Sequence, residues 1–495
     1  MADYDVIVVG AGNAALCAAM AARENNTKVL VLERAPESEK GGNSYFTAGG
    51  FRFAHDGLED VCEDVCTDLS PEEREQIVLP EHNRQFFYDQ LMEVTHHQAD
   101  EDLAWTLIDG SRPAMGWLRN HGVRFIPMFG RQSFLVDGKH HFYGGVNIEA
   151  VGGGAGLVEA ELAYALKMGV EIRYDTAAIG LIQNDQRVVT GVKIRSKDGY
   201  SEISAKAVVL ACGGFESNPQ MRVQHFGPGW DLAKVRGTRH NMGEGINMAL
   251  AIGAQPYGNW SGCHACEWDI SAPPHGDRWV LDNFQKHSYP LGIMVNLNAE
   301  RFVDEGADYR NLTYAKYGRE IMKQPRRTAI QIFDQQTVDM LRDEYRIKEV
   351  TRVESDTIAG LAEQLELDPA ALERTVSEYN AACGPQEFNP AILDGKCTTG
   401  ITPPKSHWAL PINKPPYVAY VTTTGITFTF GGLKINTKGE VQDMTDQSIP
   451  GLYAAGELVG GLFYENYPGG TGLMSGTVFG KLAGESAAEY VAAAR

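Results

Sequence analysis

The chain has 495 residues, of which 43% are hydrophobic, which suits a globular protein of two or three domains and excludes a disordered one. Its 64 acidic residues against 44 Lys and Arg give a formal charge of −20, which disfavours a nucleic-acid partner. Eight scattered cysteines indicate reduced thiols. A strand expected from Tyr4 leaves no room for a signal peptide, and no apolar run reaches about 18 residues, so we expect a cytoplasmic protein.

The first 33 residues carry a dinucleotide-binding pattern. An apolar strand, Val6 to Val9, enters the turn Gly10 to Gly12, a helix of small residues follows, and a second apolar run ends at Glu33. Gly12 lets the backbone approach a pyrophosphate, Ala15 permits close helix packing, and the helix N-terminus favours phosphate. Glu33 is placed to accept hydrogen bonds from an adenosine ribose, so the pattern favours NAD or FAD over NADP.

Further glycine segments alternate with helices and strands. Residues 41–50 form a glycine-bracketed loop that we interpret as a cofactor contact, and residues 58–121 show the spacing of scaffold helices. A second glycine cluster at 152–157 opens an amphipathic helix that reaches about Met168. Strands are expected at 171–174, 179–183, 188–195 and 207–211, the last running into Cys212-Gly213-Gly214-Phe215.

The chain changes character between about residues 257 and 420, where glycine motifs thin out and tryptophans, prolines and charged helices dominate. We interpret this stretch as an inserted second domain. Beyond it, Pro450 to Glu457 indicates a strand and glycine turn, and a last helix is expected from about Gly472 to Ala492. Cys263 and Cys266 have the spacing of half a zinc site without a second half, so we expect no metal.

Five segments occur in one order: the N-terminal pattern with Glu33, then residues 41–44, 211–215, 300–305 and 454–457. Together they resemble the flavoprotein superfamily of fumarate reductases and succinate dehydrogenases, and within it the tricarballylate dehydrogenases most closely. The resemblance implies an α/β fold with a Rossmann-like FAD-binding domain built from residues 1–256 and 421–495. An α+β capping domain for the substrate, residues 257–420, is expected to be inserted between these two parts.

The resemblance also implies an extended and noncovalent FAD, because Asn43 stands where some relatives carry the histidine that binds flavin covalently. The amides around Met474 and Ser475, at a helix N-terminus, are expected to stabilise the negative charge of reduced flavin. The implied FAD contacts are Gly10, Gly12, Asn13, Ala14, Ala15, Glu33, Arg34, Gly42, Asn43, Ser44, Gly49, Gly50, Ala178, Ala211, Gly213, Gly456, Glu457, Gly472, Met474 and Ser475.

The implied reaction is hydride transfer between a substrate carbon and the flavin, with proton transfer at the adjacent carbon. Arg310 falls near the position of the proton-transferring arginine of fumarate reductases, but one extra residue separates it from the motif, so Tyr309 is its rival. An arginine exchanges protons only where carboxylates and desolvation surround it. His264 takes the position of a histidine that binds substrate. The alternatives are that Arg310 forms a surface ion pair and that His264 is an ordinary buried histidine.

Two positions depart from the fumarate reductases. Phe428 replaces a histidine, and Tyr467 replaces the arginine that clamps a carboxylate. The segment Tyr467 to Gly469 instead resembles 3-ketosteroid dehydrogenases, in which a tyrosine hydroxyl polarises a substrate ketone. Cations for a polycarboxylate would then come from other loop residues: Arg52, Arg131, His140 and Arg310. The aromatic residues between 260 and 289 are expected either to line a flat apolar pocket or to pack a core.

We therefore expect an FAD-dependent dehydrogenase or reductase that interconverts a C–C single and double bond next to a carboxylate or carbonyl. Tricarballylate oxidation to cis-aconitate is the leading instance. The rival enzyme is a ketosteroid-type dehydrogenase or enone reductase that uses Tyr467 as oxyanion donor. A third hypothesis is a flavin electron-transfer subunit without small-molecule turnover. The expected partners are a small-molecule substrate, either a polycarboxylate or an enone or ketone, and a soluble or membrane electron acceptor.

Overall fold

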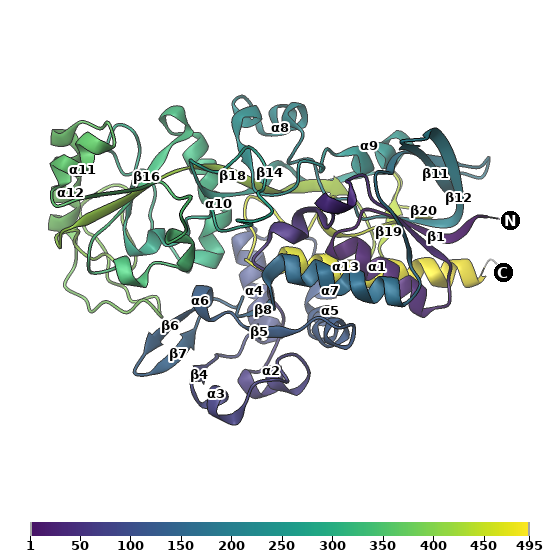
Figure 1. Ribbon diagram of the computed structural model, residues 1–495, viewed down its shortest axis with the longest axis horizontal. Helices are drawn as coiled ribbons and strands as arrows, with labels where there is room; N and C mark the ends of the chain where they lie inside the picture. Colours follow the sequence, from purple (N-terminus) through teal and green to yellow (C-terminus); the bar gives the residue numbers. More distant parts are fainter. Residues whose placement is uncertain (1, 494–495) are drawn as a thin grey trace.

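Both ends of the chain lie in the same half of the molecule, and the middle of the chain forms the other half (Figure 1). The computed structural model describes residues 2–493. Its larger sheet contains a parallel part whose strands are, in spatial order, β20 (Ser448–Ala454), β12 (Gly199–Leu210), β1 (Tyr4–Val9), β2 (Val29–Leu32) and β9 (Glu171–Arg173). This order brings the first and last strands of the chain into one sheet, as expected for a discontinuous domain.

Strand β12 extends beyond this parallel part. Its first half pairs antiparallel with β11 (Val189–Ser196), which pairs with β10 (Ala177–Gln183), and β19 (Glu440–Gln442) pairs with β20. These observations confirm the strands predicted between residues 171 and 211, although β12 begins earlier, at Gly199. The apolar residues of β1 and β2 are buried on both faces, as is usual in a parallel sheet covered by helices.

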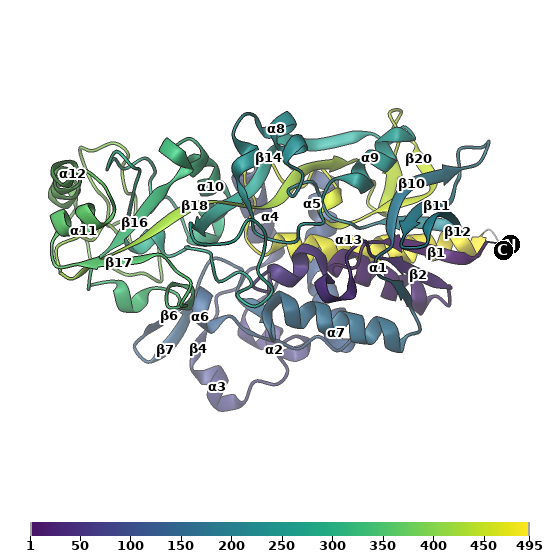
Figure 2. The same cartoon turned by 45° about the horizontal axis from the view of Figure 1, so that its top comes forward.

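The helices α1 (Asn13–Glu24) and α13 (Thr471–Ala493) lie against each other over the parallel strands (Figures 1 and 2). The contact is close because α13 turns glycines toward α1. A Cβ atom added at Gly480 would lie 2.4 Å from the carbonyl oxygen of Ala14, and one at Gly484 would lie 2.2 Å from that of Ala18. The final helix that the sequence predicts is therefore confirmed, and its glycines permit this approach.

The predicted helical stretch between residues 58 and 121 is confirmed as α2 (Leu58–Asp64), α3 (Pro71–Glu75), α4 (Arg84–Val94) and α5 (Glu101–Asn120). The predicted helix after the second glycine cluster is α7 (Gly153–Lys167), and residues 42–46 form one 3₁₀ turn. Short strands complete this region: β3 (Gly50–Phe51), β4 (Ile77–Val78), β5 (Phe125–Pro127), β6 (Ser133–Val136), β7 (Lys139–Phe142) and β8 (Ile148–Ala150), with α6 (Phe129–Gln132).

The other half is organised around the long strand β18 (Tyr417–Leu433), which runs from one half of the molecule into the other (Figure 1). It pairs with β13 (Lys234–Val235), β14 (Pro256–Asp269), β16 (Ala329–Phe333) and β17 (Arg352–Ser355), and β15 (Ile293–Val295) pairs with β16. The helices α11 (Ile358–Gln364) and α12 (Pro369–Ala382) cover the outer end of this sheet. Helix α10 (Arg310–Met322) packs on β14. The helices α8 (Pro219–Phe226) and α9 (Glu244–Ala251) precede β14 in the chain.

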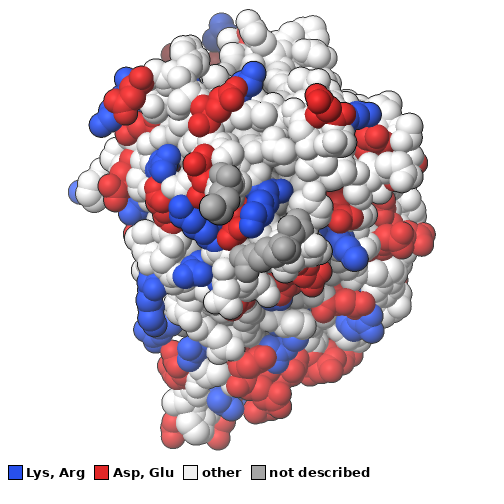
Figure 3. Space-filling view, turned by 90° about the vertical axis from the view of Figure 1, so that its right-hand side faces the viewer, with Lys and Arg blue, Asp and Glu red and all other residues white. Residues whose placement is uncertain are grey.

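The predicted domain limits fall on two of these strands. Residue 257 lies at the start of β14, whereas residue 421 lies inside β18, so one continuous strand would belong to both proposed domains. Within residues 2–493, no helix is long and apolar enough to cross a membrane. On the face around the chain ends, Lys and Arg side chains are interspersed with Asp and Glu side chains and form no continuous basic area (Figure 3).

Candidate active site

A long pocket lies at the carboxyl ends of the parallel strands, the edge at which open α/β sheets bind their ligands. It continues between the two halves of the molecule. Sixteen of the predicted cofactor contacts line it: Gly10, Gly12, Asn13, Ala14, Glu33, Arg34, Gly42, Asn43, Ser44, Gly50, Ala178, Ala211, Gly213, Gly456, Glu457 and Gly472. Four others, Ala15, Gly49, Met474 and Ser475, do not line it; Met474 and Ser475 are buried in the first turn of α13, whose Leu473 does.

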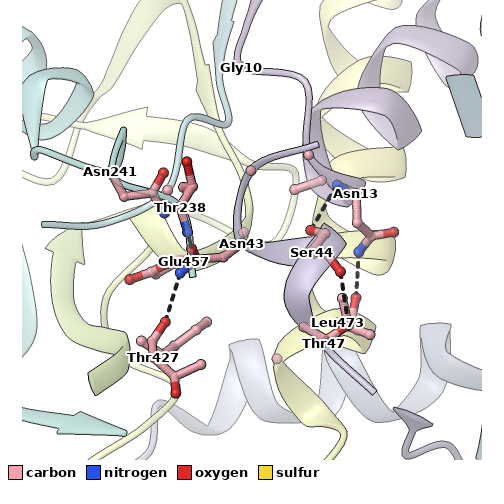
Figure 4. A pocket seen from close by; sticks show the side chains of 18 of the residues that line it. Gly10, Asn13, Asn43, Ser44, Thr47, Thr238, Asn241, Thr427, Glu457 and Leu473 are labelled. Carbon is pink, nitrogen blue, oxygen red and sulfur yellow. Dashed lines mark hydrogen bonds between the residues drawn. The ribbon is translucent and has the colours of Figure 1, made fainter. Parts of the chain in front are cut away.

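The glycine turn after β1 is needed for close packing at this edge. Gly10 has a φ of 109°, and a Cβ atom there would lie 2.4 Å from the carbonyl oxygen of Ala211. Helix α1 begins directly after the turn, at Asn13. The Asn13 amide N–H donates to Ser44 Oγ at 3.1 Å, and its side-chain Nδ2 donates to the carbonyl of Leu473 at 2.8 Å (Figure 4). The first turns of α1 and α13 are thus held together at one pocket, where both offer amide donors.

Glu33 lies at the end of β2, buried at the pocket wall. Its Oε1 accepts a hydrogen bond from the amide of Ala35 at 2.8 Å. Burial raises the pKa of Glu33, and backbone hydrogen bonds from Ala35 and Ala11 oppose this rise. The neighbouring Arg34 pairs with Glu244 on the same wall. A carboxylate held in this way is suited to binding ribose hydroxyls.

Asn43 is locked by the protein itself. Its Nδ2 donates to Glu216 Oε1 at 2.6 Å. The same Nδ2 donates to the carbonyl of Thr427 at 2.8 Å, and Oδ1 accepts from the amide of Thr238 at 2.9 Å (Figure 4). Because these partners occupy the Asn43 side chain, we infer that Asn43 contacts a cofactor through its backbone and that its side chain fixes the loop.

Glu216 and Glu457 form a buried carboxyl pair beside this loop. Glu216 Oε1 also accepts from Asn241 at 2.6 Å, and Glu457 Oε1 accepts from the amide and hydroxyl of Thr429 at 2.8 and 3.0 Å. Burial, and then the charge of Glu457, hold the pKa of Glu216 well above its ordinary value, so Glu216 stays protonated. The sequence analysis did not identify Glu216, which follows Gly213-Gly214-Phe215 directly.

The second half of the molecule contributes polar side chains to the same pocket. His264 and Tyr467, both predicted site residues, line it, as does Arg310 from the first turn of α10. Tyr309 does not line this pocket; it faces a neighbouring cavity. Phe428 lines the pocket as well, its ring parallel to that of Tyr467 at 6.1 Å between ring centres.

Four arginines converge here, and they differ in their counterions. Arg131 Nη1 and Nη2 contact the Asp282 carboxylate at 2.5 and 3.2 Å, and Arg236 lies 3.6 Å from the same group. Although burial alone would raise it, the neighbouring arginines lower the pKa of Asp282, which therefore balances one of the two charges. Arg342 Nε lies 3.3 Å from Glu344 Oε1 without forming a hydrogen bond.

Arg310 is paired with no carboxylate of residues 2–493. Its guanidinium donates to Gln132 Oε1 and to the carbonyl of Arg131, and it lies 5.4 Å from the ring centre of Tyr314. Its Nε is buried without a partner in the described part of the chain. An unpaired cation at a pocket wall favours an anionic ligand.

The phenols of Tyr314 and Tyr467 share a hydrogen bond at 2.6 Å between their oxygens. Burial raises the pKa of both groups, so both remain neutral, and one hydroxyl proton is available to an acceptor in the pocket. The His264 ring packs against both phenol rings, at 4.8 and 4.9 Å between centres. Burial, and then the charge of Arg236, hold the pKa of His264 well below its ordinary value, which makes it a neutral imidazole.

Other predicted substrate contacts lie elsewhere. Arg52 is fully buried outside the pocket, where it donates to the carbonyls of Gly469 and Gly144 at 2.9 and 2.6 Å, so it holds two loops together. His140 contacts Ser133 Oγ at 3.1 Å and does not line the pocket. Of the aromatic residues between 260 and 289, Trp268, Phe284 and Tyr289 pack in the core, Trp260 stacks on Phe215, and Trp279 is exposed.

The sequence analysis missed several polar pocket residues, among them Arg236, Tyr314 and Arg342. Tyr314 lies one helical turn after Arg310, a spacing that would have identified it. The two arginines follow short or irregular segments and carry no motif. Within residues 2–493, no three or more His, Cys, Asp or Glu side chains gather to hold a metal, and Cys263 and Cys266 are buried thiols of β14.

Comparisons with known proteins agree with this geometry. The family model for an FAD binding domain matches residues 5–473. A probable fumarate reductase of Shewanella frigidimarina is 29% identical over 98% of this chain and 75% of its own length. A urocanate reductase of Eggerthella lenta is 28% identical over 98% of this chain and 75% of its own length. A vinyl phenol reductase of Lactiplantibacillus plantarum is 27% identical over 99% of this chain and 97% of its own length.

Solved structures give the same result for the fold. The open conformation of a flavocytochrome c3 fumarate reductase superposes with a TM-score of 0.73 at 27% identity and covers 99% of this chain and 78% of its own. A 3-ketosteroid Δ1-dehydrogenase from Sterolibacterium denitrificans shares the fold, with a TM-score of 0.73 at 22% identity, 99% of this chain and 100% of its own.

The residues present fit FAD. The glycine turn, the buried Glu33 and the first turns of α1 and α13 open onto one long pocket, as an extended dinucleotide requires. The chain belongs to the FAD binding domain family, within the superfamily of fumarate reductase and succinate dehydrogenase flavoproteins, and is an FAD-dependent oxidoreductase that acts on CH–CH groups.

Proposed function

We propose that this enzyme reduces the C=C bond of an α,β-unsaturated carboxylate. The observation that carries the proposal is Arg310, a half-buried guanidinium at the pocket wall with no carboxylate partner in residues 2–493. The relatives named above are reductases of fumarate, urocanate and vinyl phenol, which supports the reductive direction. FAD is proposed to be noncovalent, since residues 41–50 contain no histidine.

FAD, when bound in its reduced form, would supply a hydride to the carbon remote from the carboxylate. A proton from the protein would add to the adjacent carbon, so that two C–H bonds would replace the π bond. Arg310 is proposed to hold the carboxylate and to stabilise the negative charge that grows on it during the reaction. The hydroxyl pair of Tyr314 and Tyr467 offers one further hydrogen bond to the same group.

The proton donor is proposed to be a guanidinium. Arg310 stays in the proposed catalytic set, and Arg342 joins it as the better acid. Burial, and then the charge of Arg310, lower the pKa of Arg342 to about 10, which brings it closer to neutral pH than an ordinary arginine. Tyr309 is the weaker proposal because it does not line the flavin pocket.

The net charge of the pocket favours a substrate with one or two carboxylate groups. Asp282 offsets one charge of Arg131 and Arg236, and Glu344 lies beside Arg342, so about two positive charges remain for the substrate. Tricarballylate, the instance that the sequence resemblance implies, carries three carboxylates. We therefore propose it behind mono- and dicarboxylates, as a substrate to be tested in the oxidative direction.

A second candidate function is reduction or dehydrogenation of a ketone-conjugated bond, as in the ketosteroid-type hypothesis. It is favoured by the Tyr314–Tyr467 hydroxyl pair, which is neutral, buried and placed to donate to a carbonyl oxygen. An electron-transfer subunit without turnover remains the third proposal. In each case the partner protein would exchange electrons with the flavin.

The test is steady-state reduction by the holoenzyme with reduced methyl viologen as electron donor. Crotonate and fumarate serve as unsaturated carboxylates and cyclohex-2-enone as a neutral enone. Under the first proposal, the carboxylates are reduced with a kcat/KM at least tenfold above that of the enone. A preference for the enone would instead support the second candidate, and no reduction of any of the three would support the electron-transfer subunit.

A further inference from the structure

A second cavity adjoins the flavin pocket, and the two share Arg310 and Arg342, which line both. It is smaller than the flavin pocket and partly open to solvent. Apart from the two arginines, its most prominent lining is aromatic, from Phe134, Tyr143, Tyr309 and Trp408. These four rings come from three separate parts of the chain, and of them only Tyr309 enters the reaction proposed above, as the weaker proposal for the proton donor.

The rings are arranged in a series. Phe134 and Tyr143 stack with 5.4 Å between ring centres and 14° between planes, and Tyr143 and Tyr309 with 5.6 Å and 26°. Trp408 lies 6.2 Å from Tyr309, and its indole N–H donates to the carbonyls of Asn389 and Ile392 at 3.0 and 2.9 Å. These bonds fix the indole, so the aromatic part of the cavity wall is held in place.

Apart from Arg310 and Arg342, the polar groups that line the cavity carry no charge. His287 lines it with a neutral, buried imidazole, because burial and the nearby arginine charges hold the pKa of His287 well below its ordinary value. The remaining apolar lining includes Leu291 and Met340. A mostly apolar cavity whose charged groups are the two arginines that it shares with the flavin pocket resembles a site for an amphipathic small molecule, with the charged end of that molecule next to the arginines.

We propose that this cavity binds an aromatic ring attached to the reacting double bond of the substrate. The preferred substrates are then aryl-substituted unsaturated carboxylates, of which 3-phenylpropenoate is the simplest, in preference to small di- and tricarboxylates. The inference rests on the proposed function, since the carboxylate and double bond must still lie in the flavin pocket. Burial of a phenyl ring predicts a kcat/KM about 30-fold higher for 3-phenylpropenoate than for crotonate.

The test compares these two substrates in the wild-type holoenzyme and in two variants of Met340, a half-buried residue of the cavity wall. Met340→Trp fills the cavity, and Met340→Leu is the matched control. Binding of the product analogues 3-phenylpropanoate and butanoate is measured by calorimetry on the same samples. We expect Met340→Trp to lower kcat/KM for 3-phenylpropenoate at least tenfold and to weaken 3-phenylpropanoate binding to the same degree. Crotonate turnover stays within threefold, and Met340→Leu stays within threefold for both substrates.

Two other results would overturn the inference in distinguishable ways. If crotonate is reduced as fast as 3-phenylpropenoate, or if Met340→Trp slows both equally, the cavity binds no ring while the proposed function stands. If neither acid is reduced and neither product analogue binds, the proposed function itself fails. If Met340→Trp loses FAD absorbance, Phe134→Ala is used in its place. It removes one half-buried ring of the stacked pair and should lower the ratio of kcat/KM for 3-phenylpropenoate to that for crotonate about fivefold.

Discussion

Replacement of Arg310 by Met tests the proposed substrate anchor. The variant keeps an apolar stem against Tyr314 but removes a pocket guanidinium that pairs with no carboxylate of residues 2–493. A charge-assisted hydrogen bond contributes about 1.5–3 kcal/mol, and loss of one partner of a desolvated pair costs about 2–5 kcal/mol. An intermediate value of about 3 kcal/mol corresponds to a fall of about 150-fold in kcat/KM for crotonate.

The assay is steady-state reduction of crotonate, with FAD content and thermal stability measured on each sample. Both KM and kcat should change, because the charge on the carboxylate grows as the reaction proceeds. Arg310→Lys should recover only part of the loss, since an ammonium group lacks the planar fork of a guanidinium. Arg319→Met is the matched control on the same helix, where Arg319 donates to the carbonyl of Glu465 at 3.1 Å. An Arg310→Met enzyme with full FAD and kinetic constants within threefold of wild type would refute the reasoning.

Three further predictions concern other parts of the site. Tyr467→Phe should lower kcat for a neutral enone about 100-fold and for crotonate less than tenfold, because guanidiniums support only the anion; equal losses would contradict this division. Glu33→Ala should raise the Kd of FAD about 10–100-fold in fluorescence titrations of apoenzyme, whereas Glu37→Ala, at an exposed position, should not change it. Burial raises the pKa of Glu149 to about 7, so the folded protein keeps this proton to higher pH than the unfolded chain and loses stability between about pH 4.5 and 7. The difference in unfolding free energy between Glu149→Gln and wild type should therefore be up to about 3 kcal/mol more favourable to the variant at pH 8 than at pH 5. Denaturant titrations in which this difference is the same at both pH values would contradict the prediction.

Local patterns identified the nucleotide end of the site. The strand, Gly10 to Gly12 and Glu33 lie within 33 residues, so their spacing alone brings them to one edge of a sheet. The catalytic end depends on pairing between distant segments. Arg236 reaches the pocket because β13 pairs with β18, and Arg342 because it follows β16 in the same sheet. No short-range pattern records such pairings, so these residues were missed.

Burial explains the predicted contacts that lie elsewhere. Arg52 follows the glycine loop as a substrate cation would, yet its donors are taken by the carbonyls of Gly469 and Gly144 and by the side chain of Gln90. Asn43 lines the flavin pocket, as the predicted contact requires, while its side chain is satisfied by Glu216, Thr427 and Thr238. Sequence position gives the neighbourhood of a side chain, whereas competition among buried hydrogen-bond partners decides what it binds.

The central claim is that electrons pass from the flavin of this enzyme to an unsaturated carboxylate. The most direct test is an anaerobic titration of the photoreduced holoenzyme with crotonate. The titration is monitored by absorbance near the maximum of oxidised flavin. We predict full reoxidation by one equivalent of crotonate per FAD, with butanoate as the product and Arg310→Met at least 100-fold slower. A flavin that stays reduced in excess crotonate, fumarate and 3-phenylpropenoate, but is reoxidised at once by an artificial electron acceptor, would contradict the claim.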